Sequence, residues 1–210
     1  MTAEVRRKFN KVFTELQRLG LLLSSDSFFP NVTRMVSGRD IVGSWWSDES
    51  AHTIFAVSEM LADHSDVLVM KFLHGKVTYV HRELWGQVYS IGLARDDWQL
   101  QKLSPAAKSM LKLLDKEGTI QTDKLRKSLG PRPGDIAREL ESRLLVHAEQ
   151  VHTESGKHAK ILESWECWAK RVGYRARAQN SVAARRYLEE RVAGIQRSTR
   201  NVFPWPAELK

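Results

Sequence analysis

Basic residues near the C-terminal end form the clearest group of side chains here that could do chemistry. Between residues 170 and 200 the only acids are Glu189 and Glu190. The same span holds these cations: Lys170, Arg171, Arg175, Arg177, Arg185, Arg186, Arg191, Arg197 and Arg200. Because ammonium and guanidinium groups bind phosphate oxygens, this composition predicts a phosphate-binding surface. The alternative is the solvated polar face of a helix.

Trp45 and Trp46 form a second such group, since two adjacent indole rings bring exceptional apolar bulk to one point. One interpretation makes them packing residues that close the core, because aromatic side chains mostly supply buried area. The functional interpretation is a platform on which a nucleic-acid base stacks, or a wedge beside it. On the second interpretation both are candidate base-stacking residues.

Other catalytic signatures are missing from the sequence. No serine stands in an elbow between glycines, and no glycine-rich phosphate loop occurs. Of the seven histidines, only His147, His152 and His158 lie near one another, and no carboxylate or thiol completes a metal-binding spacing. We therefore expect neither a metal nor a cofactor.

The stretch from Leu103 to Leu162 predicts the elements that would position these groups. Ser104 and Pro105 are typical of a helix start, and apolar residues at helical spacing continue to Gly118. A short second helix is predicted from Thr122 to Leu129. A third helix carries its apolar face on Ile136, Leu140 and Leu144.

Two strands follow, 145–152 and 158–162, joined by the polar loop 153–157 with a glycine suited to a hairpin turn. Three helices followed by a β-hairpin are the order of a winged helix-turn-helix. The third helix would then be the recognition helix that enters the major groove, and the hairpin would be the wing.

Candidate DNA-binding residues follow from that arrangement. Asp135, Glu139 and Glu141 lie on the third helix and would repel phosphate, which favours the wing and the arginines behind it over groove reading. The same acids favour an alternative, a winged helix that binds a protein partner. The candidate contacts are Arg132, Arg138, Lys157, Lys160, Arg175, Arg177, Arg185 and Arg186.

The rest of the chain indicates a mainly α protein with small β-hairpins, in which a helical N-terminal half packs with the winged helix. Periodicity predicts helices at 3–19, 50–62, 82–91 and 180–193. The apolar run that begins at Val67 fits a strand or a buried helix, and we favour a helix over 67–73; residues 92–102 are interpreted as a polar linker. The expected domains are 1–98, a helical half that resembles a degenerate winged-helix unit; 103–163, the winged helix; and 164–210, helices and an extended tail.

Composition limits the class of partner. The 210 residues carry a net charge of +8 with a pI near 9.7, which favours polyanions. No apolar run is long enough to span a membrane, and the N-terminus lacks the apolar core of a signal peptide. We therefore expect a cytoplasmic protein without a membrane partner.

Two stretches resemble a known family. One is Lys71-Phe72-Leu73-His74-Gly75-Lys76-Val77-Thr78-Tyr79-Val80, followed by Glu83-Leu84-Trp85 and Tyr89. The other is Leu103-Ser104-Pro105-Ala106-Ala107, which leads into the winged helix. Over roughly residues 65–165 the chain is similar to the AlkZ-type (YcaQ-type) winged-helix DNA glycosylases, and most of all to the shorter AlkZ-related proteins.

The resemblance implies binding to damaged or crosslinked DNA and a role in DNA repair. Catalysis would be hydrolysis of the N-glycosidic bond of an alkylated base. The glycosylases carry Gln-x-Gln or Gln-x-Asp after a Leu-Gly segment. Here Leu19-Gly20 is followed by Ser24-Ser25-Asp26, so Asp26 alone carries over as a candidate catalytic residue.

The sequence also spells Gln-x-Gln in Trp98-Gln99-Leu100-Gln101, where the family does not place its catalytic pair. We interpret this match as a coincidence, and a displaced active site is the alternative. The expected function is therefore DNA binding in damage recognition. An active glycosylase and a protein-interaction module are the alternatives.

Overall fold

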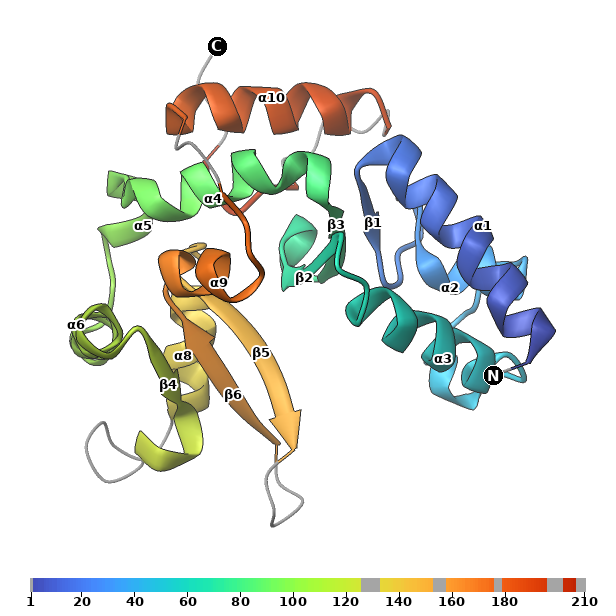
Figure 1. Cartoon of the computed structure of the whole chain (residues 1–210), viewed down its shortest axis with the longest axis horizontal. Helices are drawn as coiled ribbons and strands as arrows, with labels where there is room; N and C mark the ends of the chain where they lie inside the picture. The colour runs from blue at the N-terminus through green and yellow to red at the C-terminus, as the bar shows by residue number, and fades with distance from the viewer. Residues whose placement is uncertain (1, 126–132, 153–157, 176–178, 196–201, 207–210) are drawn as a thin grey trace. The chain divides into compact units, whose positions relative to one another are not determined.

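A computed structural model describes residues 2–125, 133–152, 158–175, 179–195 and 202–206. The chain is mainly helical with two small three-stranded antiparallel sheets (Figure 1). It divides into two compact units, Met1–Trp85 with Arg185–Val202 (unit 1) and Gly86–Ala184 with Phe203–Lys210 (unit 2). No helix of the described residues is long and apolar enough to cross a membrane.

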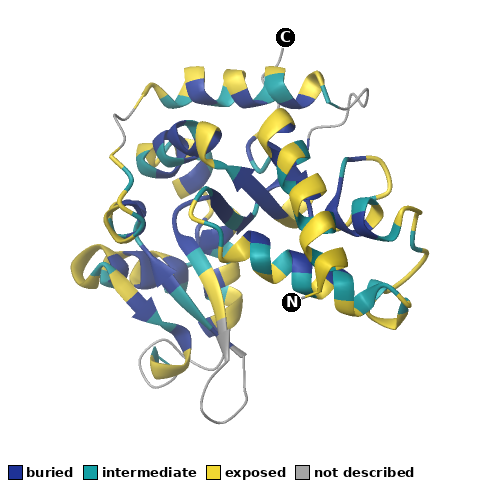
Figure 2. Ribbon diagram, turned by 45° about the vertical axis from the view of Figure 1, so that its right-hand side comes forward, coloured by how far each residue is buried: buried dark blue, intermediate teal, exposed yellow. Residues whose placement is uncertain are grey.

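Unit 1 packs helices on one small sheet. Its elements are α1 (Ala3–Leu19), β1 (Leu21–Leu23), α2 (Val32–Ser37), the 3₁₀ turn η1 (Trp45–Ser47), α3 (Ala51–Ala62), β2 (Val67–Lys71), the 3₁₀ turn η2 (Leu73–Gly75), β3 (Val77–His81) and the 3₁₀ turn η3 (Arg82–Leu84). The sheet order is β1-β3-β2. Val12 and Leu16 of α1, Val57 and Leu61 of α3, and Leu22 of β1 belong to its buried core. Exposed residues alternate with that buried stripe along the helices (Figure 2).

The turn after α1 shows why this entry into the sheet is tight. Gly20 ends α1 with a φ of 84°, a left-handed conformation that favours glycine. A Cβ at Gly20 would lie 2.6 Å from Cδ1 of Leu84. Gly20 therefore allows β1 to begin directly beside η3.

The predicted helix over 67–73 is wrong, because Val67–Lys71 is strand β2. It pairs antiparallel with β3 in the register Val67↔His81 to Lys71↔Val77. A short apolar run satisfies a buried strand and a buried helix equally. The neighbouring β-prone segment 77–81 supplies backbone partners and decides between them.

Unit 2 contains α4 (Trp85–Ala94), α5 (Asp97–Leu100), α6 (Pro105–Glu117), β4 (Thr119–Gln121), the 3₁₀ turn η4 (Thr122–Leu125), α8 (Pro133–Glu141), β5 (His147–His152), β6 (His158–Glu163) and α9 (Trp165–Arg171). The first residue of α4, Trp85, still belongs to unit 1. Helix α10 (Ser181–Ala193) begins in unit 2 and ends in unit 1. The sheet order is β4-β6-β5, and α6 and α8 pack on it through Met110, Leu114, Ala137 and Leu140.

Four expectations for unit 2 change. The third helix ends at Glu141, so Leu144, expected on its apolar face, lies beyond the helix with a φ of 55°. The hairpin β5–β6 gains a third strand, because Thr119–Gln121 pairs with Glu163–Ile161. The polar linker over 92–102 is wrong in part, since it contains α5 with a capping box between Asp96 and Gln99. The second helix appears as η4 as far as Leu125, and residues 126–129 lie outside the described residues.

Candidate functional site

Asp26 lies in the loop between β1 and α2, and its carboxylate is almost entirely enclosed. Its side chain is 6% exposed. Oδ1 accepts hydrogen bonds from the backbone amides of Phe28 and Phe29, each at 2.8 Å. Oδ2 accepts one from Nζ of Lys76 at 2.7 Å. The loop is therefore folded around this carboxylate.

These contacts set the charge of Asp26. Burial alone raises the pKa of its carboxyl group, but the bonds from Lys76, Phe28 and Phe29 outweigh burial and lower that pKa below its usual value. Asp26 is therefore ionised at neutral pH. An ionised carboxylate can stabilise a developing positive charge or orient a water molecule.

A polar pocket of about 460 Å³ opens beside Asp26. Asn31 shapes its wall, because its Nδ2 donates to the carbonyl oxygens of Asp26 at 2.8 Å and Phe29 at 2.9 Å. Arg34 and Asp40, which form an ion pair, line the pocket together with Lys76. Two cations and two carboxylates thus face the same space, and their formal charges cancel.

Gln99, the first glutamine of the Gln-x-Gln match, has a structural role. Gln99 is fully buried; its Oε1 accepts from the backbone amide of Asp96 and its Nε2 donates to the carbonyl oxygen of Arg143, both at 2.9 Å. Arg143 in turn donates to the carbonyl oxygen of Trp98 at 2.7 Å. The buried amide of Gln99 thus ties α5 to the segment after α8.

Trp45 and Trp46 are stacked, with ring centroids 4.1 Å apart and planes at 23°. Trp45 is half-buried against the core of unit 1, whereas Trp46 is 63% exposed. The ring centroid of Phe55 of α3 lies 5.7 Å from that of Trp46, and Phe55 is 45% exposed. The structure thus separates a packing tryptophan from a presented one and adds Phe55, which the sequence alone did not indicate.

The acids of α8 are engaged within unit 2. Glu139 accepts hydrogen bonds from the backbone amide of Ser104 at 2.7 Å and from its hydroxyl at 2.8 Å, at the start of α6. Glu141 forms an ion pair with Lys160 of β6, and both side chains are mostly buried. Asp135 lies 3.4 Å from Arg138, and both are exposed.

The candidate cations differ in their surroundings. Arg175 and Arg186 are exposed, and Arg185 is half-buried. Arg171 and Arg191, from the same basic block, bind Glu163 and Glu83, each at 2.7 Å between Nη2 and a carboxylate oxygen. The predicted contacts Arg132, Lys157 and Arg177 lie outside the described residues.

A family model of AlkZ-related proteins matches residues 6–195. The chain belongs to the AlkZ-related family. The match confirms the resemblance carried by residues 71–89 and 103–107, and it includes Asp26, Trp46, α8 and α10. No curated protein and no solved structure matches the chain.

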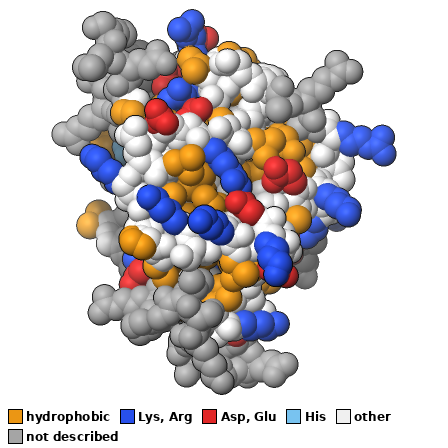
Figure 3. All heavy atoms as spheres, turned by 90° about the vertical axis from the view of Figure 1, so that its left-hand side faces the viewer, with side chains coloured by type: hydrophobic (Ala, Val, Ile, Leu, Met, Phe, Trp, Pro, Cys, Tyr) orange, Lys and Arg blue, Asp and Glu red, His pale blue; other side chains and the backbone are white. Residues whose placement is uncertain are grey.

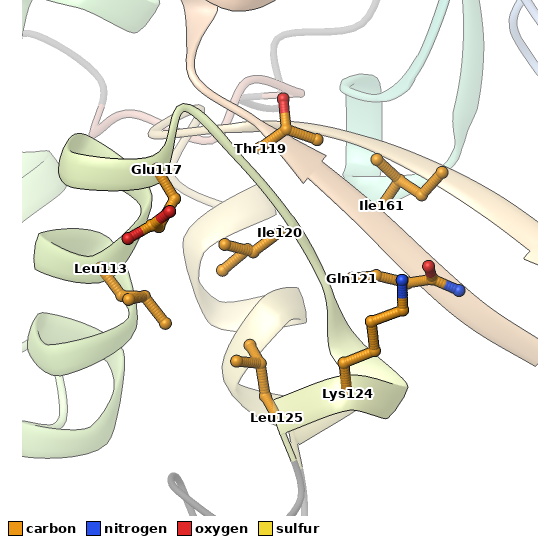
Figure 4. A pocket seen from close by; sticks show the side chains of 8 residues that line it. All are labelled: Leu113, Glu117, Thr119, Ile120, Gln121, Lys124, Leu125 and Ile161. Atoms are coloured by element: carbon orange, nitrogen blue, oxygen red, sulfur yellow. The ribbon is translucent and has the colours of Figure 1, made fainter.

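A second pocket in this AlkZ-related chain lies in unit 2, between α6, β4 and η4. It has a volume of about 430 Å³, and Leu113, Ile120 and Leu125 converge in it (Figure 4). Lys124 and Gln121 stand at its side. Its mainly apolar walls hold none of the residues that the sequence singled out.

The described residues contain no group of three or more His, Cys, Asp or Glu side chains that could hold a metal ion. His147 illustrates how its histidines are used. Its Nδ1 lies 3.1 Å from Glu163, and its ring packs on Trp165 and Trp168. This histidine belongs to the packing between β5, β6 and α9.

Proposed function

We propose that this AlkZ-related protein binds DNA through a winged helix-turn-helix formed by residues 103–163 and acts in the recognition of damaged DNA. The observation that carries the proposal is the order α6, β4, η4, α8, β5, β6 with the sheet β4-β6-β5. In winged helices the helix before the hairpin reads the major groove, and the hairpin contacts the backbone or minor groove. Here those elements are α8 and β5–β6.

The contacts of α8 support this assignment, because they weaken the argument from its acidic residues against DNA binding. Glu141 is paired with Lys160, which offsets its charge. Glu139 keeps its charge, but Ser104 holds its carboxylate at the start of α6. Asp135 is balanced by Arg138. The acids of α8 therefore favour a protein partner less than the sequence alone indicates.

Phosphate contacts are assigned to cations that the fold leaves exposed. Arg138, Arg175 and Arg186 meet that condition, and Arg185 lies beside them in the sequence. Arg132, Lys157 and Arg177 complete the proposed set. Lys160 would have to leave Glu141 to reach a phosphate, so its first role is to hold β6 against α8.

Trp46 is the proposed stacking residue for an unpaired base. The ring of Trp45 stacks on one face of Trp46 and packs on the core of unit 1, so the position of Trp46 is fixed in the absence of DNA. Stacking of a base on an aromatic side chain contributes about 1–3 kcal/mol per base to the binding of single-stranded DNA. An exposed platform of this kind suits a nucleotide that damage has loosened from its partner.

Fluorescence anisotropy of the full chain tests the proposal. Labelled duplex and single-stranded DNA, with and without an alkylated base, are titrated at about 50 and about 200 mM salt. We expect binding that weakens with salt and is tighter on the damaged strand. Absence of salt-dependent binding at micromolar protein would reject the proposal.

Active glycosylase chemistry is the second candidate, and the ionised Asp26 beside a 460 Å³ polar pocket favours it. In this case Asp26 would orient a water molecule at the anomeric carbon and stabilise the positive charge of the sugar as the base leaves. The measurement is release of free alkylated base. It should be lost in Asp26→Asn and retained in Asp40→Asn, a carboxylate of the same pocket wall; a panel of lesions without release would reject it.

A further inference from the structure

Helix α6 carries three lysines in a row, at positions 108, 112 and 116. A spacing of four residues places successive side chains about 6 Å apart along the helix and on nearly the same face. All three are exposed, and the side chain of Lys116 is 80% exposed. Figure 3 views the side of the molecule on which α6 lies, and several cationic side chains are exposed on it, with acidic and hydrophobic side chains between them.

The row faces away from the elements that α6 packs against. Ala107, Met110, Leu111 and Leu114 form the buried stripe of the helix, which contacts α8 and the sheet β4-β6-β5. The lysines lie on the opposite side of the helix from that stripe, because their positions are rotated by more than a right angle from its centre. The row is thus a different surface of unit 2 from the β5–β6 hairpin.

The carboxylates of α6 neutralise only one end of the row. Asp115 is occupied by Arg95, whose Nη1 lies 3.0 Å from Oδ2. Glu117 lies 3.6 Å from Lys116. Among the described residues no carboxylate is within ion-pair distance of Lys108 or Lys112, so the face keeps an excess of positive charge.

We propose that Lys108, Lys112 and Lys116 form a second contact with the phosphate backbone of DNA, independent of sequence. The inference rests on the proposed DNA binding and adds a surface that the sequence did not indicate. Eight residues of helix span about 12 Å. A DNA strand presents a phosphate about every 3.4 Å of its axis, so three lysines can each meet one without bending the helix.

Lysine favours this backbone role over base reading. Its ammonium group is a compact point charge without the fork with which arginine recognises guanine edges. The row therefore adds affinity that is equal on damaged and undamaged DNA. A protein with two backbone contacts on different surfaces of one unit suits a strand that wraps or branches around it.

The test compares the wild-type chain with Lys108→Gln/Lys112→Gln/Lys116→Gln in the anisotropy assay, at four or more salt concentrations. Each lost phosphate contact makes the negative slope of log K against log salt shallower by about 0.9, so we expect its magnitude to fall by about 2 to 3. The ratio of affinities for damaged and undamaged DNA should not change. Thermal unfolding followed by circular dichroism should give the wild-type Tm, since the three side chains are exposed.

A charge-matched control is available on α1, where Arg6, Arg7 and Lys11 are exposed. Changing these three to Gln removes the same charge from unit 1 and should alter the slope by less than one. Equal slopes in the two variants, or no change in the α6 variant while the wild type binds DNA, would overturn the inference and leave the proposed function standing. A wild type that does not bind DNA would overturn both.

The alternative ligand of the three lysines is an acidic segment of a partner protein. A labelled poly-glutamate peptide serves as its probe, with duplex DNA as competitor. Binding of the peptide that depends on the three lysines, without displacement by DNA, would make the row a protein-docking surface and would overturn the proposed phosphate contact.

Should the triple variant unfold, Lys112→Glu reverses the central charge alone and is expected to weaken duplex binding several-fold.

Discussion

Lys76 and Asp26 form an ion pair, with Nζ 2.7 Å from Oδ2, between two segments fifty residues apart in the chain. Lys76 belongs to the stretch 71–80 on which the family resemblance rests, and Asp26 is the residue carried over from the family's catalytic motif. The pair thus joins both sequence signals at one pocket of unit 1. It also fixes the loop that leads from β1 to α2.

The first prediction concerns the stability of that loop. Replacing Lys76 with Met removes one charge-assisted hydrogen bond and should lower the free energy of unfolding by about 1–2 kcal/mol. Asp26→Ala removes the bonds to Phe28 and Phe29 as well and should cost about 2–4 kcal/mol. Urea unfolding of both variants and of the double variant gives the coupling energy; additive losses would contradict a direct interaction.

Acid should weaken the same contact. The pKa of Asp26 is lower in the folded than in the unfolded chain, so its contribution to stability is full above the unfolded pKa and is lost as pH falls through the folded one. The expected window lies below about pH 4. In Asp26→Asn the dependence of Tm on pH should be shallower there than in Asp40→Asn, whose carboxylate is more exposed.

The second prediction concerns Glu163, whose carboxylate lies between His147 and Arg171. Burial raises the pKa of Glu163, but the hydrogen bonds from His147 and Arg171 outweigh burial and bring it to about 2. A shift from the usual value near 4.5 to about 2 corresponds to about 3 kcal/mol of stability at neutral pH. That stability is fully present above about pH 4.5 and is lost as pH falls toward 2.

Unfolding of Glu163→Gln followed from pH 7 to pH 2 checks this prediction. The variant should lose about 3 kcal/mol at pH 7 and show a flatter acid limb than the wild type. Glu149→Gln is the matched control, since Glu149 is 55% exposed and lies 4.0 Å from Arg171. Equal acid limbs in Glu163→Gln and the wild type would show that Glu163 is not the group responsible.

The elements that local spacing and capping specify could be predicted from the sequence. Ser104 caps α6, Gly20 ends α1, and both helices carry their apolar residues at helical spacing. Strand β4 could not be predicted, because its three residues become a strand only by pairing with Glu163–Ile161. The same limit applies to β2, whose identity depends on β3.

The candidate site shows the same division between local and distant information. Asp26 could be named by its place after Leu19-Gly20, but its partner Lys76 lies fifty residues away. The acids of α8 were visible, yet Ser104 and Lys160, which engage them, come from other elements. The charge that α8 presents therefore depends on Lys160 of β6 as well as on its own residues.

The third prediction separates a structural from a phosphate-binding role of Lys160. In Glu141→Gln the mostly buried ammonium of Lys160 loses its partner, and stability should fall by about 3 kcal/mol. Lys160→Met with Glu141→Leu should recover most of that loss, because two apolar side chains replace a buried pair at little cost. The recovered double variant should also keep wild-type DNA affinity; a tenfold loss would assign Lys160 to the phosphate contacts.

The fourth prediction concerns Trp46 and the base-stacking platform. Trp46→Ala should leave Tm within a few degrees of the wild type, because the ring is 63% exposed. It should weaken binding to single-stranded DNA by about 1–3 kcal/mol, or roughly five- to more than a hundredfold. Trp45→Ala serves as the structural comparison, since its ring packs on the core and its loss should lower Tm clearly. Anisotropy with single-stranded DNA, together with quenching of tryptophan fluorescence, measures the effect. Unchanged affinity in Trp46→Ala would leave the pair with a packing role alone.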